Sequence, residues 1–253
     1  MNLSGIVRQA EVVSVDVGTY TTLVLRNRDL AQAARPGQFV HIQCGEHQLR
    51  RPISIGGVTE DTLTLIMEVK GKGTRWLSER RPGDVLDLLG PLGTGFPEIG
   101  GKVLLVGGGV GVPPMFSAAQ KLENCDALLA FRSADRMLLE EEFRPLCGSV
   151  TVMTDDGSYG AKGFAAQGVQ ALLQQENYSA VFACGPKIML KTVTAACKEA
   201  GVPVYVSLEE RMGCGIGACL GCSIPLEGPE GRHMARVCAD GPVFRGEEVV
   251  WDA

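Results

Sequence analysis

The stretch Lys102–Glu123, KVLLVGGGVGVPPMFSAAQKLE, decides how the middle of this chain folds. Its first residues form a short apolar run that ends in three consecutive glycines, and two prolines then open a segment with helical character. Proline is tolerated in the first turn of a helix, where its missing N–H would have no partner. The stretch therefore predicts a buried strand, a glycine-rich turn and a helix, the unit from which parallel α/β sheets are built.

The same alternation of strand and helix continues downstream. Strand-like apolar runs lie at residues 127–131, 150–154, 180–183 and 204–207, and helical runs lie at 163–174 and 187–200. Regular alternation of this kind predicts a doubly wound parallel sheet. The acidic run at residues 138–146, LLEEEFRPL, is interpreted as a solvated helix face.

The chain before residue 100 has a different pattern. Short runs rich in Val, Ile, Leu and Thr lie at residues 5–15, 19–27, 37–44, 52–57, 62–70 and 84–91. Turn signals such as Pro36-Gly37 and Pro82-Gly83 separate these runs. Many short strands at close spacing predict a small antiparallel β-barrel, with one short helix near residues 73–80.

Composition and charge narrow the class of protein. The chain has 253 residues, of which 45% are hydrophobic and 21% charged, with a net charge of −5. These values are typical of a globular protein and argue against nucleic acid as a partner. No apolar run reaches the roughly 18 residues that span a bilayer, and the first 16 residues lack the pattern of a secretory signal. The fold class is therefore predicted to be multidomain α+β: residues 1–99 form the barrel, residues 100–205 the α/β domain, and residues 206–253 a small cysteine-rich domain.

Four of the nine cysteines form a motif. Their spacing is C-x4-C-x2-C-x15-C, made by Cys214, Cys219, Cys222 and Cys238. This spacing is typical of a plant-type 2Fe–2S cluster. A structural zinc site, which would make the chain a non-redox interaction module, usually needs two C-x2-C pairs, and only one is present. An odd number of cysteines without an export signal also predicts a reducing compartment, so we expect a cytoplasmic protein.

Two motifs in the barrel segment suit a flavin. Arg51-Pro52-Ile53-Ser54 presents a guanidinium and a hydroxyl from one predicted strand, and a guanidinium forms a planar donor fork for a pyrophosphate. Gly73 and Thr74 would open the short helix and offer N–H groups to the same pyrophosphate. By themselves these motifs leave an ordinary strand entry and helix start equally open.

Three turns in the α/β segment are candidates for nucleotide binding. They follow predicted strands, and nucleotides bind at the carboxyl ends of parallel strands. The residues concerned are Gly107, Gly108, Gly109 and Gly111, then Asp155 and Asp156, then Cys184, Gly185 and Pro186. Cys184 is either a contact of the nicotinamide or flavin ring or an inert buried thiol. The choice between NAD and NADP is also open, because Arg132 and Arg136 could face a 2′-phosphate.

No catalytic base for a substrate is evident in the chain. The histidines His41, His47 and His233 show no ligand spacing, and we expect them to face solvent or to bond locally. No Ser-His-Asp signature or pair of carboxylates is present either.

In combination, the motifs carry a family resemblance. RRPISI, GKGT, GGGVGVPP, DDGSYG, CGP and the cysteine loop resemble the ferredoxin reductase superfamily. Within it, SLEERMGCGIGACLGC and CADGPVF are most similar to the electron-transfer subunits of class 1B dihydroorotate dehydrogenases. The resemblance implies a FAD site formed by Arg51, Pro52, Ile53, Ser54, Ile66, Met67, Glu68, Gly73 and Thr74. Many superfamily members have an aromatic residue at the position of Ile53, so stacking on the flavin by this side chain is left open.

The resemblance also implies a division of labour. An FMN-containing catalytic subunit would oxidise dihydroorotate for pyrimidine biosynthesis, in a heterotetramer with two copies of each subunit. This chain would carry the electrons through a 2Fe–2S cluster and FAD to NAD+, which explains why it has no substrate base. The closest alternative is the small flavin and iron–sulfur subunit of a ferredoxin:NADP oxidoreductase or of a sulfide dehydrogenase.

Overall fold

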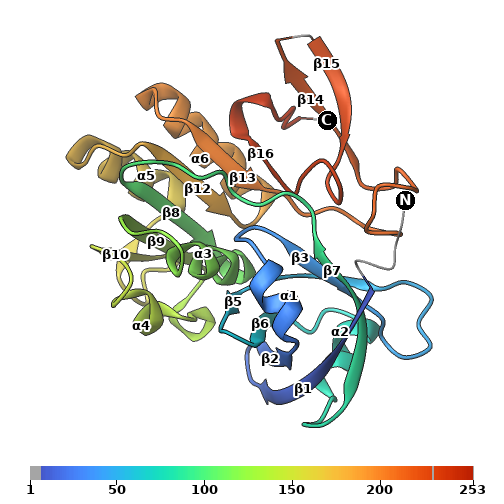
Figure 1. Ribbon diagram of the computed structural model, residues 1–253. Coiled ribbons are helices and arrows are strands. Elements are labelled where there is room, and N and C mark those ends of the chain that lie inside the picture. The colour runs from blue at the N-terminus through green and yellow to red at the C-terminus, as the bar shows by residue number, and fades with distance from the viewer. Residues whose placement is uncertain (1–6, 230, 253) are drawn as a thin grey trace.

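The computed structural model describes residues 7–229 and 231–252 (Figure 1). Residues 5 and 6 of the first predicted strand lie outside the described residues. The N-terminal block contains β1 (Val7–Val17), β2 (Thr21–Arg26), α1 (Arg28–Ala33), β3 (Phe39–Ile42), β4 (Arg51–Ser54), β5 (Gly57–Val58), β6 (Thr62–Met67), α2 (Lys72–Ser78) and β7 (Val85–Leu92).

The seven strands of this block form one antiparallel sheet. Their order is β4-β3-β7-β1-β2-β6-β5, so β4 and β5 lie at its two edges and the sheet is a half-barrel. Alternate side chains along the strands, among them Val12, Leu23, Leu65 and Leu88, meet in its interior. The helix predicted near residues 73–80 is α2, which begins one residue earlier.

The middle block is the predicted parallel sheet. It contains β8 (Val103–Gly108), α3 (Val112–Ala119), β9 (Cys125–Phe131), α4 (Glu140–Phe143), β10 (Val150–Thr154), β11 (Ala161–Lys162), α5 (Ala165–Gln175), β12 (Ala180–Cys184), α6 (Lys187–Ala200) and β13 (Val204–Ser207). The strand order is β11-β10-β9-β8-β12-β13-β16, and all pairs except the last are parallel. The order reverses direction between β8 and β12, which is the switch point of a doubly wound sheet.

Helices cover both faces of this sheet, as the alternation along β8 requires. Leu104 and Val106 pack in the core that contains α5 and α6, whereas Val103 and Leu105 pack in the core that contains α3 and α4.

The prediction for residues 138–146 is wrong in one respect. Glu140 is 8% exposed, and its carboxylate binds Arg144 and the Tyr159 hydroxyl instead of solvent.

The C-terminal segment contains strands that the sequence pattern did not reveal. β14 (Ser223–Gly228) and β15 (Gly231–Arg236) form an antiparallel hairpin. β16 (Val243–Arg245) then pairs with β13 and extends the parallel sheet by one antiparallel strand. The glycine-rich cysteine loop, which connects β13 to β14, lies at the edge of the molecule between the β14–β15 hairpin and the half-barrel (Figure 1).

Close packing joins the half-barrel to the parallel sheet. Gly56, the residue before β5, packs directly on Pro113 at the start of α3. A Cβ added to Gly56 would lie closer than 3.0 Å to the Pro113 ring, which is nearer than real Cβ atoms come. An ion pair of 3.0 Å between Arg136 Nη1 and Glu68 Oε1 spans the same boundary. The Tyr20 hydroxyl adds a hydrogen bond to the Arg136 carbonyl. None of the helices in the described residues has the length and apolar character needed to cross a membrane.

Candidate redox site

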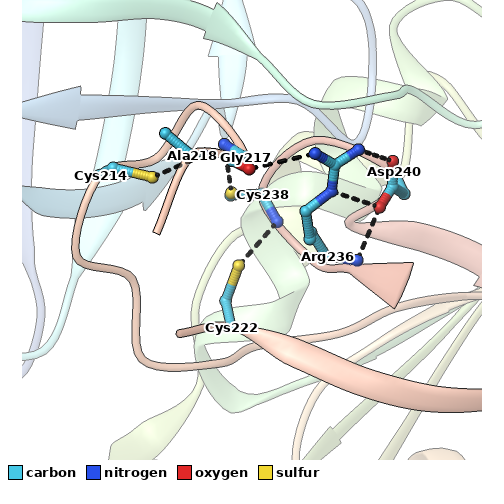
Figure 2. A network of polar contacts seen from close by, with 7 residues as sticks. All are labelled: Cys214, Gly217, Ala218, Cys222, Arg236, Cys238 and Asp240. Atoms are coloured by element: carbon cyan, nitrogen blue, oxygen red, sulfur yellow. Dashed lines mark hydrogen bonds and ion pairs between the residues drawn. The ribbon is translucent and has the colours of Figure 1, made fainter. Parts of the chain in front are cut away.

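Three of the four motif cysteines, Cys214, Cys222 and Cys238, lie on stretches of backbone that face each other (Figure 2). The Cys214 sulfur accepts hydrogen bonds from the N–H groups of Ala218 at 3.3 Å and Cys219 at 3.4 Å. The Cys238 sulfur accepts one from the N–H of Gly217 at 3.2 Å. The N–H of Cys238 in turn donates to the Cys222 sulfur at 3.5 Å. Backbone donors aimed at sulfur are what a ligated cluster needs, because they stabilise its negative charge.

The sulfurs are arranged in two pairs. The Cys219 thiol lowers the pKa of Cys214, and the Cys222 thiol raises the pKa of Cys238. Burial raises the pKa of Cys214, but the N–H groups of Ile216, Cys219 and Ala218 outweigh it and lower the pKa to about 6. The thiolate, which is the ligating form, is therefore favoured at neutral pH.

Over residues 7–229 and 231–252, no three His, Cys, Asp or Glu side chains are placed to hold one metal ion. Two thiol pairs from one loop and its neighbour suit a cluster with two irons.

An arginine that the sequence analysis missed supports the cysteine loop. Arg236 forms a two-pronged ion pair with Asp240, with hydrogen bonds of 2.8 and 2.7 Å (Figure 2). Its remaining nitrogen donates to the Gly217 carbonyl at 3.0 Å. The same Gly217 donates its N–H to Cys238, so the ion pair fixes a peptide that contacts a ligand. The only sequence signal was a charged pair flanking Cys238.

The structure brings two of the expected flavin residues together. Arg51 on β4 lies against Gly73 on α2, where a Cβ would come closer than 3.0 Å to the guanidinium. The absence of a side chain at Gly73 therefore makes room for the guanidinium at the start of α2. A guanidinium beside helix N–H groups is a suitable cradle for a pyrophosphate. The Thr74 hydroxyl bonds the backbone of Gly71 and Lys70, so it caps the helix.

The remaining expected flavin residues follow the alternation of their strands. The side chains of Ile53 and Met67 belong to the half-barrel core, so these residues have only their backbone for a ligand. Pro52 and Ser54 lie on the opposite face of β4. Ile66 is buried on β6, and Glu68 after it holds the ion pair with Arg136.

The glycine turn after β8 meets the turn after β12. Gly107 and Cys184 lie opposite each other in the sheet register. A Cβ on Gly111 would clash with the Cys184 carbonyl, and one on Gly108 would approach Pro186 and Met189. Gly185 in turn packs on Gly108. These turns line the switch point of the sheet, where a dinucleotide binds in doubly wound folds.

Other predicted nucleotide residues lie apart from this crevice. Asp155 and Asp156 follow β10, which is two strands away from β8. Asp156 accepts hydrogen bonds from Ser158, so its carboxylate stabilises its own turn.

Two residues at the crevice itself remain. Gly109, in the turn after β8, has open space around it. Desolvation raises the pKa of Cys184 to about 12, so this residue is a neutral thiol at the crevice.

The expectation for His41 is wrong. This side chain is 0% exposed, and neither ring nitrogen has a hydrogen-bond partner. Burial lowers the pKa of His41, an effect that the backbone of Cys214 partly offsets. Burial therefore favours the neutral form of the ring. His47 is half-buried and His233 exposed, as expected of residues outside the site.

The fold and the site together define a class of protein. One solved structure, of an NADH-dependent reduced ferredoxin–NADP oxidoreductase studied for electron bifurcation, has a TM-score of 0.87 and 33% identity. The match covers 96% of this chain and 90% of that chain. A ferredoxin reductase of carbazole 1,9a-dioxygenase has a TM-score of 0.67 and 23% identity, covering 79% of this chain and 68% of that chain. The chain thus has the ferredoxin-reductase-like fold, with an antiparallel half-barrel and a parallel sheet, in a protein of the flavin and iron–sulfur type.

Sequence relatives define the family within that class. Residues 209–250 match the iron-sulfur cluster binding domain of dihydroorotate dehydrogenase B. A dihydroorotate dehydrogenase B (NAD(+)) electron transfer subunit from Geobacillus thermodenitrificans is 43% identical over 241 residues, covering 90% of this chain and 91% of the relative. The subunit of the same name from Shouchella clausii is 40% identical and covers 97% and 96%. The chain belongs to the family of dihydroorotate dehydrogenase B electron transfer subunits.

Proposed function

We propose that this chain carries electrons from a dihydroorotate-oxidising FMN subunit to NAD+ in pyrimidine biosynthesis. The observation that supports this most directly is the cysteine loop, where backbone N–H groups donate to the sulfurs of Cys214, Cys222 and Cys238. When bound, a 2Fe–2S cluster supplies one-electron transfer and FAD links it to two-electron transfer to NAD+. The chain's own residues bind and orient these groups. Cys214, Cys219, Cys222 and Cys238 hold the cluster, and Arg51 with Gly73 binds the flavin pyrophosphate.

The same proposal includes the three-domain organisation. Residues 1–99 bind FAD, residues 100–205 bind NAD, and residues 206–253 bind the cluster. The half-barrel and its separate core support the first boundary. The pairing of β16 with β13 ties the third domain to the second, which favours a fixed position for the cysteine loop. NAD is favoured over NADP because Arg136, one of the two arginines near the crevice, is already paired with Glu68.

We also place the partner subunit at the cysteine loop, in a heterotetramer with two copies of each subunit. Cys219 is exposed, and its neighbour Leu220 is 63% exposed. A groove runs from Leu220 to Met234 on β15, which is 62% exposed. Apolar side chains around an exposed cluster ligand suit the docking of a partner protein whose redox group must come within electron-transfer distance of the cluster. The nine free cysteines are consistent with the reducing cytoplasm.

The assay is reduction of NAD+ by dihydroorotate, using the complex that co-purifies with the chain from its host. We expect the complex to contain FMN, FAD and iron, and to reduce NAD+ when dihydroorotate is added. A complex that lacks an FMN subunit and ignores dihydroorotate would refute this function. Because a ferredoxin–NADP oxidoreductase chain is similar over nearly the whole fold, reduction of NADP+ by reduced ferredoxin is the second activity to measure. A colourless protein that contains zinc would refute both functions.

A further inference from the structure

His41 lies on the outer face of the half-barrel, toward the cysteine loop. Side chains alternate along β3, and Val40 and Ile42 point into the half-barrel core. Phe39 and His41 therefore point the other way. Phe39 packs in the core that includes Cys222 and Cys238. His41 is thus at the boundary between the flavin block and the proposed cluster domain.

The imidazole of His41 is completely buried, and its ring nitrogens make no well-formed hydrogen bond. Its side chain is 0% exposed, and both Nδ1 and Nε2 lack a hydrogen bond. An unsatisfied buried polar group costs about 1–3 kcal/mol, whereas an apolar residue of similar size would not. A neutral imidazole has one N–H to donate and one nitrogen to accept. This side chain therefore has a donor available at the boundary.

The cysteine loop is shaped to receive this ring. Gly215 has φ of +72°, and a Cβ there would lie closer than 3.0 Å to His41 Nδ1. Any side chain at Gly215 would displace the ring. The backbones of Cys214, the residue before it, and of Arg50 are the polar groups that the His41 ring approaches. On its other side, β3 pairs with β4 in a register that sets His41 opposite Pro52, within the expected flavin motif.

We propose that His41 is a positioning residue that holds the cluster loop in place against the flavin-binding strands. With the cluster bound, its ring N–H donates to the backbone carbonyl of Cys214, and Gly215 keeps the space for the ring. The imidazole thereby fixes the separation between a cluster ligand and β4. This inference rests on the proposed function, because it assumes that electrons pass between a cluster at the loop and a flavin at β4.

The test uses the complete complex with its catalytic subunit and two substitutions of His41. His41→Leu removes the donor, whereas His41→Asn places an amide N–H near the position of Nδ1. His47→Leu is the matched control, because that histidine lies in the same block and outside the site. The measurements are iron content, the electron paramagnetic resonance spectrum of the dithionite-reduced cluster, the single-turnover rate of FAD reduction by dihydroorotate, and the rate of FAD reduction by NADH.

We expect His41→Leu to shift the cluster spectrum and to slow FAD reduction by dihydroorotate at least tenfold. FAD reduction by NADH should change less than twofold, because that step does not involve the loop. His41→Asn should restore the wild-type spectrum and most of the rate, and His47→Leu should match wild type. A wild-type spectrum and rate in His41→Leu would overturn the inference.

Two further outcomes separate the inference from the proposed function. If the wild-type complex has a cluster but ignores dihydroorotate, the proposed function fails, and the spectra of the variants still test His41. If His41→Leu does not fold, His41→Gln replaces it, since Gln carries its amide near Nε2. The inference then requires a wild-type spectrum in His41→Asn and a shifted one in His41→Gln, and identical spectra would overturn it.

Discussion

Single residues set the chemistry of the cysteine loop through backbone N–H groups. Gly217 has φ of +80°, in the region that glycine adopts at little cost, and its N–H points at the Cys238 sulfur. Leu220 has φ of +60° without being glycine, so the loop holds a conformation that costs free energy. Its surroundings maintain this turn, because the Leu220 carbonyl accepts hydrogen bonds from the N–H and the hydroxyl of Ser223.

Cys222→Ser tests whether the cluster carries electrons. We expect the variant to lose iron, because Cys222 is buried and a serine hydroxyl is a poorer iron ligand. Dihydroorotate oxidation should be uncoupled from NAD+ reduction, while NADH still reduces FAD. Iron analysis and the two half-reactions measure this, and equal loss of both half-reactions would mean that the cluster is only structural.

Gly111→Ala tests the close approach at the nucleotide crevice. Gly111 has φ of −81°, which alanine adopts freely, so the only obstacle is the Cys184 carbonyl that a Cβ would meet. We expect a loss of about 1–3 kcal/mol in the free energy of unfolding and a KM for NADH raised at least threefold. Urea denaturation and steady-state kinetics measure the two effects.

Gly109→Ala is the control for this variant. Gly109 has open space but φ of +53°, so alanine should cost about 1–2 kcal/mol of backbone strain without a clash. Its KM for NADH should stay within twofold of wild type. Equal KM values in the two variants would contradict the role given to the contact between the turns.

At the scale of elements, a buried charge network joins the amino ends of the sheet strands. Asp126 on β9 is 2% exposed and accepts hydrogen bonds from Lys102 and Tyr178, each at 2.7 Å. Burial alone raises the pKa of Asp126, but hydrogen bonds from Lys102, Tyr178 and Ser149 together lower it below its ordinary value. The network connects the start of β8, the start of β9 and the segment after α5.

Asp126→Asn should lower stability in a pH-dependent way. A carboxyl whose folded pKa is depressed stabilises the protein above its unfolded pKa of about 3.9 and loses that effect as the pH falls through the folded pKa. We expect the free energy of unfolding to fall by about 1–3 kcal/mol at pH 7. This loss should shrink progressively below pH 4, because the Asp126 carboxylate is then protonated while Lys102 stays charged. Urea denaturation of both proteins at pH 7 and pH 3 measures this. A difference independent of pH would exclude the charge as its cause.

Periodicity decided which elements could be predicted. α6 was predicted at its observed bounds, because fourteen residues show a clear apolar face. α1 and β5, with six and two residues, were missed because they are too short to show a period. β14, β15 and β16 were missed because glycine, proline and charged residues interrupt their alternation.

At the scale of the whole molecule, the two blocks leave one face of the cluster segment uncovered. The cysteine loop packs on the half-barrel through the core that contains Phe39, Leu92 and Cys238. The groove between Leu220 and Met234 lies on the surface of the same segment. The cysteine loop thus packs on the half-barrel on one side and carries an exposed groove on another.

Met234→Glu tests the proposed partner surface. A carboxylate in the centre of an apolar contact has to be desolvated on binding, so we expect the affinity for the catalytic subunit to fall at least tenfold. Val17→Glu is the control, because Val17 is 60% exposed on β1 in the half-barrel. Subunit association by analytical ultracentrifugation and NADH oxidation by the isolated chain are measured. Unchanged association in Met234→Glu would move the interface elsewhere.

The sequence by itself determined the parallel sheet and the antiparallel block, and it predicted the four cysteines as cluster ligands. These features depend on local periodicity and short spacings, which involve only residues that are close together in the sequence. Only the tertiary structure decided the burial of His41, the support of Gly217 by Arg236, and the addition of β16 to the parallel sheet. Each of these joins residues that are separated in the chain, and a contact of that kind leaves no periodic trace in the sequence. A lone histidine between apolar residues looks the same whether its strand faces solvent or a cluster loop.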